Sequence, residues 1–413
     1  MMREKENKVP KRRFKKFETD DAWQKREFSD IFNLSQGLQI EISKRFVNPG
    51  DNMYFYITNE FLRSDSNERY YIYNPPVSVL CDESDILMTR TGNTGIVVTD
   101  VKGCFHNNFF KIKYESKNYD KHFICQYLST PNKQKEILNS AGSSTIPDLS
   151  HKSFYKLLGN FPNIIEQKRI SDFLIKLDNI ITRHQSKLEK MKALKKAYLT
   201  DMFPAEGERK PKLRFAGFTD DWEMRKLGDV IDGLYNGQTP SRFRDDFWNG
   251  NINWLSSGEL NRSVVRMTSE KITAAGQDNA NLRIVPKNTF VMAITGLEAA
   301  GTRGNCGILG IDTTLNQSCM AVFPNKKMLS TQFLFQWYKV VGEDYGIRFT
   351  QGTKQQSYNA AIVKNLDICL PKVEEQSRIS TFLSELDNLI TLHQNKLDKL
   401  QNIKKAYVNE MFI

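Results

Sequence analysis

The sequence predicts an α+β fold in which two globular α/β domains are separated by a pair of long antiparallel coiled-coil helices, with the two halves related by a pseudo-two-fold internal repeat. Three observations lead to this prediction. The chain has 413 residues, which is too long for one ordinary domain. A 42-residue segment recurs at an offset of 209 with 24 identical positions. Both copies of that segment carry apolar residues at heptad spacing.

The repeat is strongest at the end of each half. Residues 162–203 align without gaps on residues 371–412. The remainder matches more weakly and at a drifting offset, as when Trp23 meets Trp222, and the drift indicates insertions in loops. An old duplication with uneven divergence would explain this pattern. The pattern is explained better by a partner common to both helical segments and by different partners for the divergent segments.

Each repeated segment is predicted to form a long helix with a heptad seam. No Gly or Pro interrupts residues 166–203 or 375–412, so each stretch of 38 residues is about 57 Å long. Because both seams lie in one chain, the two helices are expected to pair with each other, antiparallel. The histidines on the seam are expected to fix the register rather than to bind metal. The seam positions are Ile170, Leu174, Leu177, Ile181, His184, Leu188 and Met191, and Ile379, Leu383, Leu386, Ile390, His393, Leu397 and Leu400.

These elements give a provisional division of the chain, with a polar, proline-bracketed linker between the halves. The predicted segments are a basic tail at 1–16, a domain at 17–162, a helix at 163–203, the linker at 204–211, a domain at 212–371 and a helix at 372–413.

Charge gives only weak information about function. The net charge is +11, but residues 1–16 alone carry eight basic and two acidic groups. Both large domains are nearly neutral, so the argument for nucleic acid depends more on the duplicated architecture than on bulk charge. The absence of a long apolar run, of a secretory signal and of any Cys-x-x-Cys pair predicts a cytoplasmic protein with reduced thiols.

No catalytic constellation emerges from the motifs. Asn74-Pro75-Pro76-Val77 lacks the aromatic residue that DNA amino-methyltransferases place after Asn-Pro-Pro, so we interpret it as a proline-rich turn. No glycine is followed by lysine, which excludes a phosphate-binding loop of the Gly-Lys-Ser/Thr type, and the five histidines lack metal-ligand spacing. The sequence therefore predicts a binding protein that is not an enzyme and holds no metal or cofactor.

Two motifs together resemble a known family. Each half opens with Pro-Lys-x-Arg-Phe-x-x-Phe followed by Trp, at residues 10–23 and 211–222. Each half closes with Glu-Gln-x-Arg-Ile-Ser-x-Phe-Leu, then Leu-Asp-Asn, then Thr-x-His-Gln-x-Lys-Leu. This combination resembles the specificity (S) subunit of type I restriction–modification systems over essentially the whole chain. The strand-like residues 85–92 and 289–296 resemble parts of that family's target-recognition domains.

The resemblance implies a division of labour in a bacterial or archaeal cytoplasm. Each target-recognition domain would read one half of an asymmetric, bipartite, gapped site in double-stranded DNA. The conserved helices would dock two methyltransferase (M) subunits, and restriction (R) subunits would join the full complex. S-adenosylmethionine, ATP and Mg would be bound by those partners and not by this chain. A coil of about 57 Å could hold two domains over major-groove faces one turn of DNA, about 34–36 Å, or somewhat more apart.

Candidate contact residues follow from side-chain chemistry and from the matched motifs. Polar residues beside glycine turns suit base reading, and Arg90 and Arg303 are the strongest candidates, although each is also compatible with an ordinary solvated loop residue. The candidate DNA-binding residues are Arg90, Thr91, Asn93, Thr94, Ser143, Ser144, Thr145, Ser256, Ser257, Thr295, Arg303, Thr353, Lys354 and Gln355. The candidate partner-binding residues are Glu166, Gln167, Arg169, Asp178, Lys187 and Tyr198, and Glu375, Gln376, Arg378, Asp387, Lys396 and Tyr407.

Three alternative functions remain compatible with these patterns. They are a solitary DNA-binding or scaffold protein without M or R partners, an RNA-binding coiled-coil protein, and an unrecognised nuclease. Co-expression with an M subunit separates the first alternative from the S-subunit interpretation.

Overall fold

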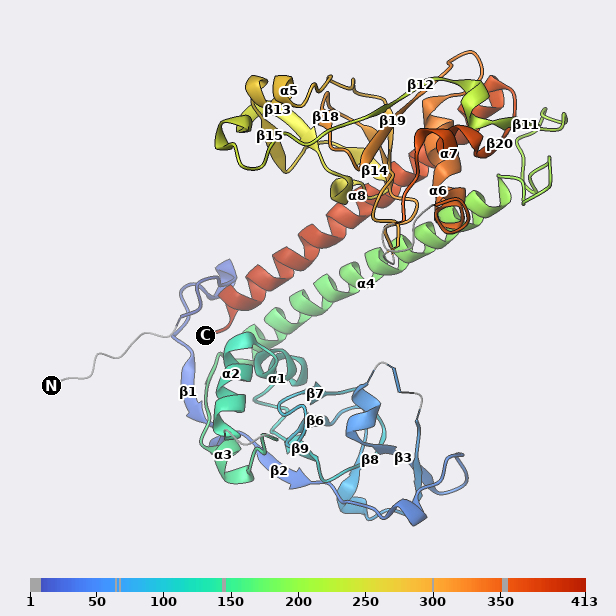
Figure 1. Cartoon of the computed structure of the whole chain (residues 1–413). Helices are drawn as coiled ribbons and strands as arrows, with labels where there is room; N and C mark the ends of the chain where they lie inside the picture. Colours follow the sequence, from blue (N-terminus) through green and yellow to red (C-terminus); the bar gives the residue numbers. More distant parts are fainter. Residues whose placement is uncertain (1–8, 64, 67, 143–145, 299–300, 351–355) are drawn as a thin grey trace. The chain divides into compact units, whose positions relative to one another are not determined.

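The structure is a computed structural model, and it describes residues 9–63, 65–66, 68–142, 146–298, 301–350 and 356–413 (Figure 1). The chain divides into two compact units. Unit 1 contains the chain up to residue 185 together with residues 395–413, and unit 2 contains residues 186–394. Within the described ranges, no helix is long and apolar enough to cross a membrane.

The described residues of unit 1 form three small sheets and three short α-helices beside the long ones. The first sheet pairs β1 (Gln24–Glu27) with β10 (Leu158–Phe161), so it ties the start of the domain to the segment that leads into the long helix. The other strands lie in sheet order β2 (Asn33–Gln36), β9 (Phe109–Lys113), β6 (Ile86–Thr89), β7 (Val97–Val98), and β4 (Tyr71–Tyr73), β3 (Met53–Ile57), β8 (Gly103–Phe105), β5 (Leu80–Cys81). The helices are α1 (Lys121–Leu128), α2 (Pro131–Ser140) and α3 (His151–Tyr155).

Unit 2 follows the same plan. Its two-stranded sheet joins β11 (Glu223–Lys226) to β20 (Asp367–Leu370). The remaining strands are ordered β12 (Ile231–Asn236), β19 (Cys319–Pro324), β16 (Phe290–Ala293), β17 (Cys306–Leu309), β14 (Ser263–Val265), and β15 (Glu270–Ile272), β13 (Trp248–Leu255), β18 (Thr314–Leu315). The helices are α5 (Ala274–Asn279), α6 (Thr331–Arg348) and α7 (Ala360–Asn365).

Short 3-10 helices connect these elements. They are η1 (Lys15–Phe17), η2 (Phe28–Asp30), η3 (Ile42–Lys44), η4 (Asn59–Leu62) and η5 (Val77–Val79) in unit 1, and η6 (Leu227–Val230), η7 (Asp245–Phe247) and η8 (Ser257–Glu259) in unit 2. Asn74 adopts a left-handed φ of 43° just before η5, which confirms the proline-rich turn.

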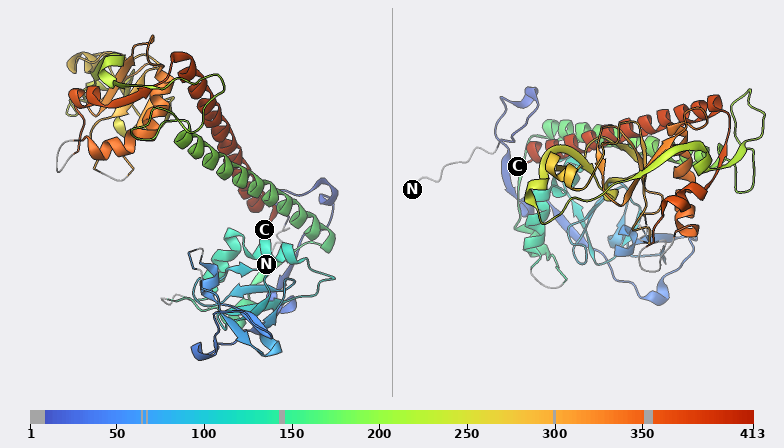
Figure 2. Two further views of the ribbon diagram at one scale, coloured as in Figure 1. Left: turned by 90° about the vertical axis from the view of Figure 1, so that its right-hand side faces the viewer. Right: turned by 45° about the horizontal axis from the view of Figure 1, so that its top comes forward.

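Two long helices, α4 (Ile164–Asp201) and α8 (Val373–Met411), are shared by both units and lie side by side (Figures 1 and 2). In unit 1, Phe173 packs edge-on against Tyr407 with ring centroids 4.8 Å apart. In unit 2, the equivalent pair, Tyr198 and Phe382, lies 4.9 Å apart. Within each unit, rising numbers on α4 meet falling numbers on α8, so the predicted antiparallel pairing is confirmed. Most of the predicted seam is buried as well, as at Leu174 and Leu383.

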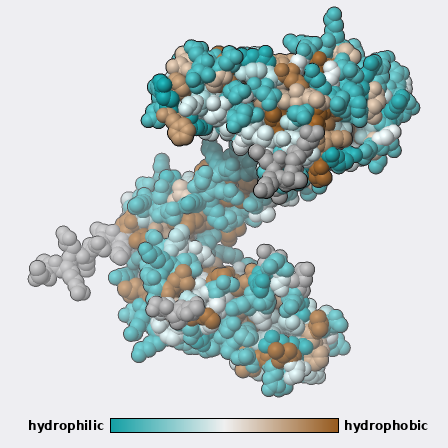
Figure 3. All heavy atoms as spheres, in the orientation of Figure 1, coloured by the Kyte–Doolittle hydropathy of each residue, from teal (hydrophilic) through white to brown (hydrophobic). Residues whose placement is uncertain are grey.

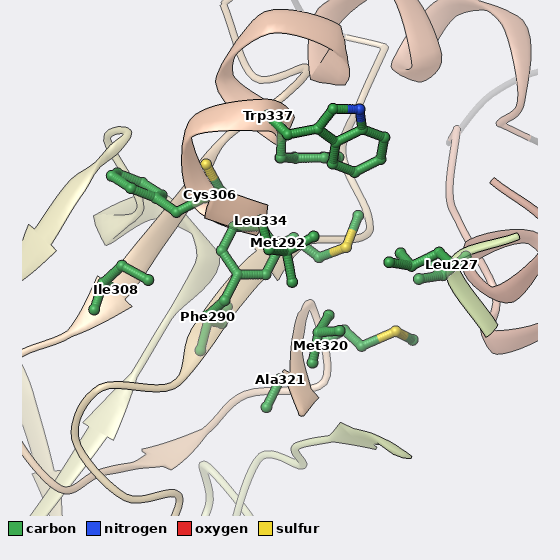
Figure 4. Packing of buried hydrophobic residues seen from close by; sticks show 14 of the residues in the cluster. Leu227, Phe290, Met292, Cys306, Ile308, Met320, Ala321, Leu334 and Trp337 are labelled. Carbon is green, nitrogen blue, oxygen red and sulfur yellow. The ribbon is translucent and has the colours of Figure 1, made fainter. Parts of the chain in front are cut away.

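The core of each unit incorporates residues at the ends of both long helices. In unit 2, Phe290 and Met292 on β16 pack with β17, β19 and Leu334 on α6 (Figure 4). Phe203, just past α4, packs against Phe333 with ring centroids 5.4 Å apart, and Trp222 lies 5.8 Å from Phe333.

The same three-ring arrangement recurs in unit 1. Phe412, just past α8, lies 5.3 Å from Phe123, and Trp23 lies 5.8 Å from Phe123. We call each trio a helix-end clasp.

Candidate nucleic-acid interface

The strongest predicted base readers of unit 1 lie in a turn that follows β6. Gly92 and Asn93 adopt left-handed φ values of 61° and 42°, which glycine and asparagine tolerate better than other residues. The Thr89 hydroxyl closes the turn by donating to the Asn93 carbonyl at 2.6 Å. We call residues 90–94 the reading turn of unit 1.

Arg90 and Thr91 are occupied within this unit. The Arg90 guanidinium donates two hydrogen bonds to Asp148, at 2.9 and 2.6 Å, and the Thr91 hydroxyl donates to the same carboxylate. The hydrogen bond from Arg90 is the main reason that the pKa of Asp148 is lowered. Thr94 is 6% exposed and donates to the Arg90 and Pro147 carbonyls. The prediction that Thr94 contacts bases is therefore wrong, because its side chain is buried and its hydroxyl bonds to carbonyls of its own unit. Asn93 is exposed, and its role in base contact stays a prediction.

The reading turn of unit 2, residues 294–297, follows β16 in the same way. Thr295 forms a bridge with Ser357, and the Tyr358 N–H donates to the Ile294 carbonyl at 2.8 Å. Arg303 lies between β16 and β17 and packs half-buried against α6, where a Cβ added at Gly346 would meet the Arg303 Cβ at 3.0 Å. Its guanidinium donates to the Gln356 side chain at 3.3 Å. Arg303 therefore braces the segment that pairs with the reading turn.

The other predicted readers have mixed outcomes. Ser256 is the N-cap of η8 in a capping box with Glu259, so its hydroxyl is used locally. Burial raises the pKa of the Glu259 carboxylate, but hydrogen bonds from Ser256 and Ser269 outweigh that effect and lower it overall. Ser257 is half-buried in the same short helix. Six predicted residues lie outside the described residues: Ser143, Ser144, Thr145, Thr353, Lys354 and Gln355.

Each reading turn adjoins a second turn, which we call the bridging turn. In unit 1 the bridging turn is residues 106–109, and its Asn108 carbonyl accepts the Arg90 N–H at 2.7 Å. In unit 2 it is residues 316–318, and its Ser318 carbonyl accepts the Ile294 N–H at 2.9 Å. The bridging turns therefore mark an equivalent edge in both units.

Sequence reasoning missed a pair of loops at this edge, which we call the tip loops: residues 37–47 after β2 and residues 237–247 after β12. Their first residues are glycines that leave no room for a side chain: a Cβ at Gly37 would clash with the His106 carbonyl oxygen of the bridging turn, and a Cβ at Gly237 would clash with the Leu315 carbonyl oxygen directly before it. The loops carry exposed apolar side chains: Phe243 is 99% exposed and Ile42 is 79% exposed. The sequence signal that could have found them is the pair of glycines at an offset of 200.

The predicted partner-binding residues divide into buried and exposed groups. Glu166 is fully buried and accepts two hydrogen bonds from Arg13, both 2.7 Å long, and Glu375 is held in the same way by Arg214. Gln167 donates to the Pro162 carbonyl at 2.9 Å and accepts from the Asp120 N–H at 3.0 Å. Gln376 makes the equivalent bonds to Pro371 and Ser330.

The expectation that these four side chains face a partner is therefore corrected, because they bind the opening motifs and domains of their own chain. Their role is to anchor each globular domain to the start of its long helix.

The remaining predicted residues lie on accessible parts of the helices. Arg169, Lys187, Arg378 and Lys396 are exposed. Asp178 and Asp387 are half-buried and pair with Lys404 and Lys195 respectively, while Tyr198 and Tyr407 pack on the opposite helix. Two apolar residues at equivalent positions add to this face: Ile180 is 43% exposed in unit 1, and Leu389 is 44% exposed in unit 2.

The visible face of the protein is mostly hydrophilic, with hydrophobic residues in small patches (Figure 3). Over the part of the chain that the structure describes, no group of three or more His, Cys, Asp or Glu residues is placed to hold a metal ion.

Comparison with known proteins identifies the family. The model of the type I restriction–modification DNA specificity domain matches residues 20–193 and again residues 219–402. The chain belongs to this family of specificity subunits. The two matches coincide with the two copies of the internal repeat, so each half of this S subunit holds one target-recognition domain and one long-helix segment.

Individual relatives match the S subunit over most of its length. The type I restriction enzyme MjaVIII specificity subunit of Methanocaldococcus jannaschii is 23% identical over 87% of this chain and 85% of its own length. The EcoBI specificity subunit of Escherichia coli is 20% identical over 95% of this chain and 86% of its own. The crystal structure of a type I S subunit from M. genitalium covers 98% of this chain and 99% of its own, with a TM-score of 0.64 at 14% identity. That structure supports the fold, with two domains and two long helices.

Proposed function

We propose that this S subunit reads an asymmetric, bipartite, gapped site in double-stranded DNA, with one half-site for each target-recognition domain. One observation carries the proposal: both units have the same arrangement of reading turn, bridging turn and tip loop, but the side chains on them differ. For example, neither Asn93 of the unit 1 reading turn nor Ile42 of the unit 1 tip loop is repeated at the equivalent position of unit 2. Equivalent frames with different surfaces suit two different half-sites, and bases between them would go unread.

We further propose that α4 and α8 dock two methyltransferase (M) subunits. The helices expose the same residue types at equivalent positions, with a basic residue at Lys187 and Lys396 and an apolar residue at Ile180 and Leu389. A duplicated surface of this kind suits two copies of one partner. The apolar positions offer contact beyond the seam that joins α4 to α8.

In this proposal the S subunit supplies recognition and no catalysis. S-adenosylmethionine, ATP and Mg would be bound by the M and R subunits. The S subunit would place the DNA so that adenines on each side of the gap reach an M subunit. The complete assembly would act as a type I DNA adenine methyltransferase and endonuclease in a bacterial or archaeal cytoplasm.

Methylome sequencing tests DNA reading directly. The S subunit is expressed with its M subunit, and methylated adenines are mapped genome-wide. We expect one gapped bipartite motif that disappears when the S gene is deleted. A continuous motif, or methylation that does not depend on the S gene, would contradict the proposal.

Size-exclusion chromatography with light scattering tests docking. We expect a complex of one S chain with two M subunits. A double variant, Ile180→Glu with Leu389→Glu, should dissociate M while leaving the S subunit folded. Full assembly by that variant would exclude this face, and a failure of wild-type S and M to associate would favour a solitary DNA-binding protein.

A further inference from the structure

The basic residues beside each exposed apolar tip have partners within their own unit. In unit 2, the Arg242 guanidinium lies 3.7 Å from the centre of the Trp248 ring and makes a bidentate ion pair with Glu270, with one bond of 2.9 Å. Arg244 forms a bidentate pair with Asp246, with both bonds 2.8 Å long. Both neighbours of Phe243 are therefore paired within unit 2, and the Phe243 side chain itself is exposed.

Unit 1 holds its tip loop by the same kind of contacts. Arg45 donates two hydrogen bonds to the Ile40 carbonyl, at 3.0 and 2.8 Å, and lies over the Tyr56 ring at 5.3 Å. The Tyr56 hydroxyl donates to the Leu38 carbonyl at 2.8 Å and accepts the Ile40 N–H at 3.0 Å. In each unit, then, an arginine stacked on an aromatic residue of the next strand holds a loop with an exposed apolar tip.

The tip loops lie at the same edge as the reading turns. In unit 2, Thr239 donates to Gln317 of the bridging turn, which also bonds to the reading turn through Ser318. In unit 1, the Gly37 N–H donates to Phe109 of the bridging turn, and Asn108 of that turn bonds to Arg90. The start of each tip loop is therefore joined to the reading turn of its own unit through the bridging turn.

The chemistry of the tips favours DNA over a protein partner. A stable protein–protein interface buries about 800 Å² on each side, whereas Phe243, the exposed large apolar residue of the unit 2 tip loop, supplies about 150–250 Å². The unit 1 tip loop exposes Leu38, Phe46 and Val47 beside Ile42, and Ile42 is the most exposed of the four. The adjacent Arg242 and Arg244 are neutralised by Glu270 and Asp246, so they support the tip and are not free to bind phosphates. A single exposed apolar side chain is sufficient for one task in DNA recognition, which is insertion between base pairs.

We propose that Phe243 and Ile42 are wedges that insert between adjacent base pairs, each in the half-site of its own domain. The insertion unstacks one step of the duplex and thereby makes recognition depend on how easily that step deforms. This inference rests on the proposed function, because it requires that the domains bind DNA.

The test uses the full S chain assembled with its M subunits and a synthetic duplex that carries the methylated sequence. Phe243→Ala is compared with Phe243→Leu, and Ile347→Ala is the matched control because Ile347 is an exposed apolar residue, 60% accessible, on α6 of the same unit. We expect Phe243→Ala to weaken binding about tenfold, Phe243→Leu to retain most of the affinity, and Ile347→Ala to bind like wild type. Ile42→Ala should act in the same way on the other half-site.

A second series identifies the wedge itself. A single abasic site is moved through the half-site, since a base that is already unstacked needs no wedge. We expect that an abasic site at one position restores the binding of Phe243→Ala to within about twofold of wild type. The abasic position that rescues Ile42→Ala should lie in the other half-site.

Wild-type affinity in Phe243→Ala, or a loss that no abasic position rescues, would overturn the wedge. If the wild-type complex did not prefer the methylated sequence over a scrambled duplex, the proposed function itself would fail, which is a separate result.

Discussion

Arg12 and Arg13 are adjacent in the chain, but the ion pair of Arg13 is buried and that of Arg12 is exposed. Arg13 pairs with Glu166, and their side chains are only 5% and 0% exposed. Arg12 pairs with Glu410 at the surface, with 51% and 35% exposure. A buried carboxylate that loses its partner cannot be solvated, whereas an exposed one can.

We therefore expect Arg13→Ala to lower the free energy of unfolding by about 3–5 kcal/mol. Arg12→Ala should leave it nearly unchanged. Urea unfolding followed by tryptophan fluorescence measures both, and equal losses would show that the Arg13–Glu166 pair is not the anchor described above.

Residue-level contacts also explain where sequence reasoning reached its limit. Arg90 sits beside a glycine turn, as the sequence suggested, but its partner Asp148 lies 58 positions away in the chain. Nothing in the local pattern shows that the two meet. The same holds for Phe243, whose complete exposure depends on the folding of the strands on both sides.

At the scale of elements, equivalent residues of α4 and α8 have different surroundings in the two units. Asp178 pairs with Lys404 in unit 1, where the two side chains are 44% and 37% exposed. Asp387 pairs with Lys195 in unit 2 and also accepts a hydrogen bond from Lys339 of α6 at 3.1 Å. Lys339 is only 8% exposed.

The same substitution should therefore have unequal effects at the two positions. Asp387→Asn leaves two poorly solvated lysines without a counterion and should cost about 2 kcal/mol, less than a fully buried pair because Asp387 is 35% exposed. Asp178→Asn should cost under about 1 kcal/mol. Thermal unfolding of the two variants measures the difference. Equal losses of stability would show that Lys339 does not increase the cost of removing the Asp387 charge.

Lys339 should also make the free energy of unfolding depend on pH. Burial lowers its pKa to about 8, against the attraction of Asp387, which raises it. Between about pH 8 and the usual value near 10.5, the unfolded chain binds more protons than the folded one, so Lys339 makes the unfolding free energy rise with pH in that window. Wild type should gain stability relative to Lys339→Met from pH 8 to 10, and parallel curves for the two proteins would contradict this.

Elements with a strong local pattern were predictable from the sequence. The heptad seam predicted α4 and α8, and the strand-like residues before Gly92 and Gly296 became β6 and β16. The small sheets could not be assigned, because their strands, such as β5 and β18, are two residues long and pair with distant partners. The burial of Glu166 and Gln167 could not be foreseen either, since identity between the two copies does not separate internal anchors from contact surfaces.

On the scale of the whole molecule, each hydrophobic core draws its residues from a single unit. Phe123 and Phe333 are equivalent members of the two helix-end clasps, and both are fully buried. We expect Phe123→Ala and Phe333→Ala each to cost about 3–5 kcal/mol.

Hydrogen–deuterium exchange then tests whether the cores are independent. Exchange should accelerate in unit 1 for Phe123→Ala and in unit 2 for Phe333→Ala. Faster exchange throughout the chain in either variant would show that the two units unfold together.

The clasp of unit 1 has a consequence for protein synthesis. Its outer ring is Phe412, while the domain that it completes ends near residue 161. A ribosome adding about 5–20 residues per second needs on the order of tens of seconds to cover that distance. The domain that ends near residue 161 therefore cannot complete its core until Phe412 has left the ribosome. During that interval, the apolar face around Phe123 depends on chaperones or on its own partial packing to avoid aggregation.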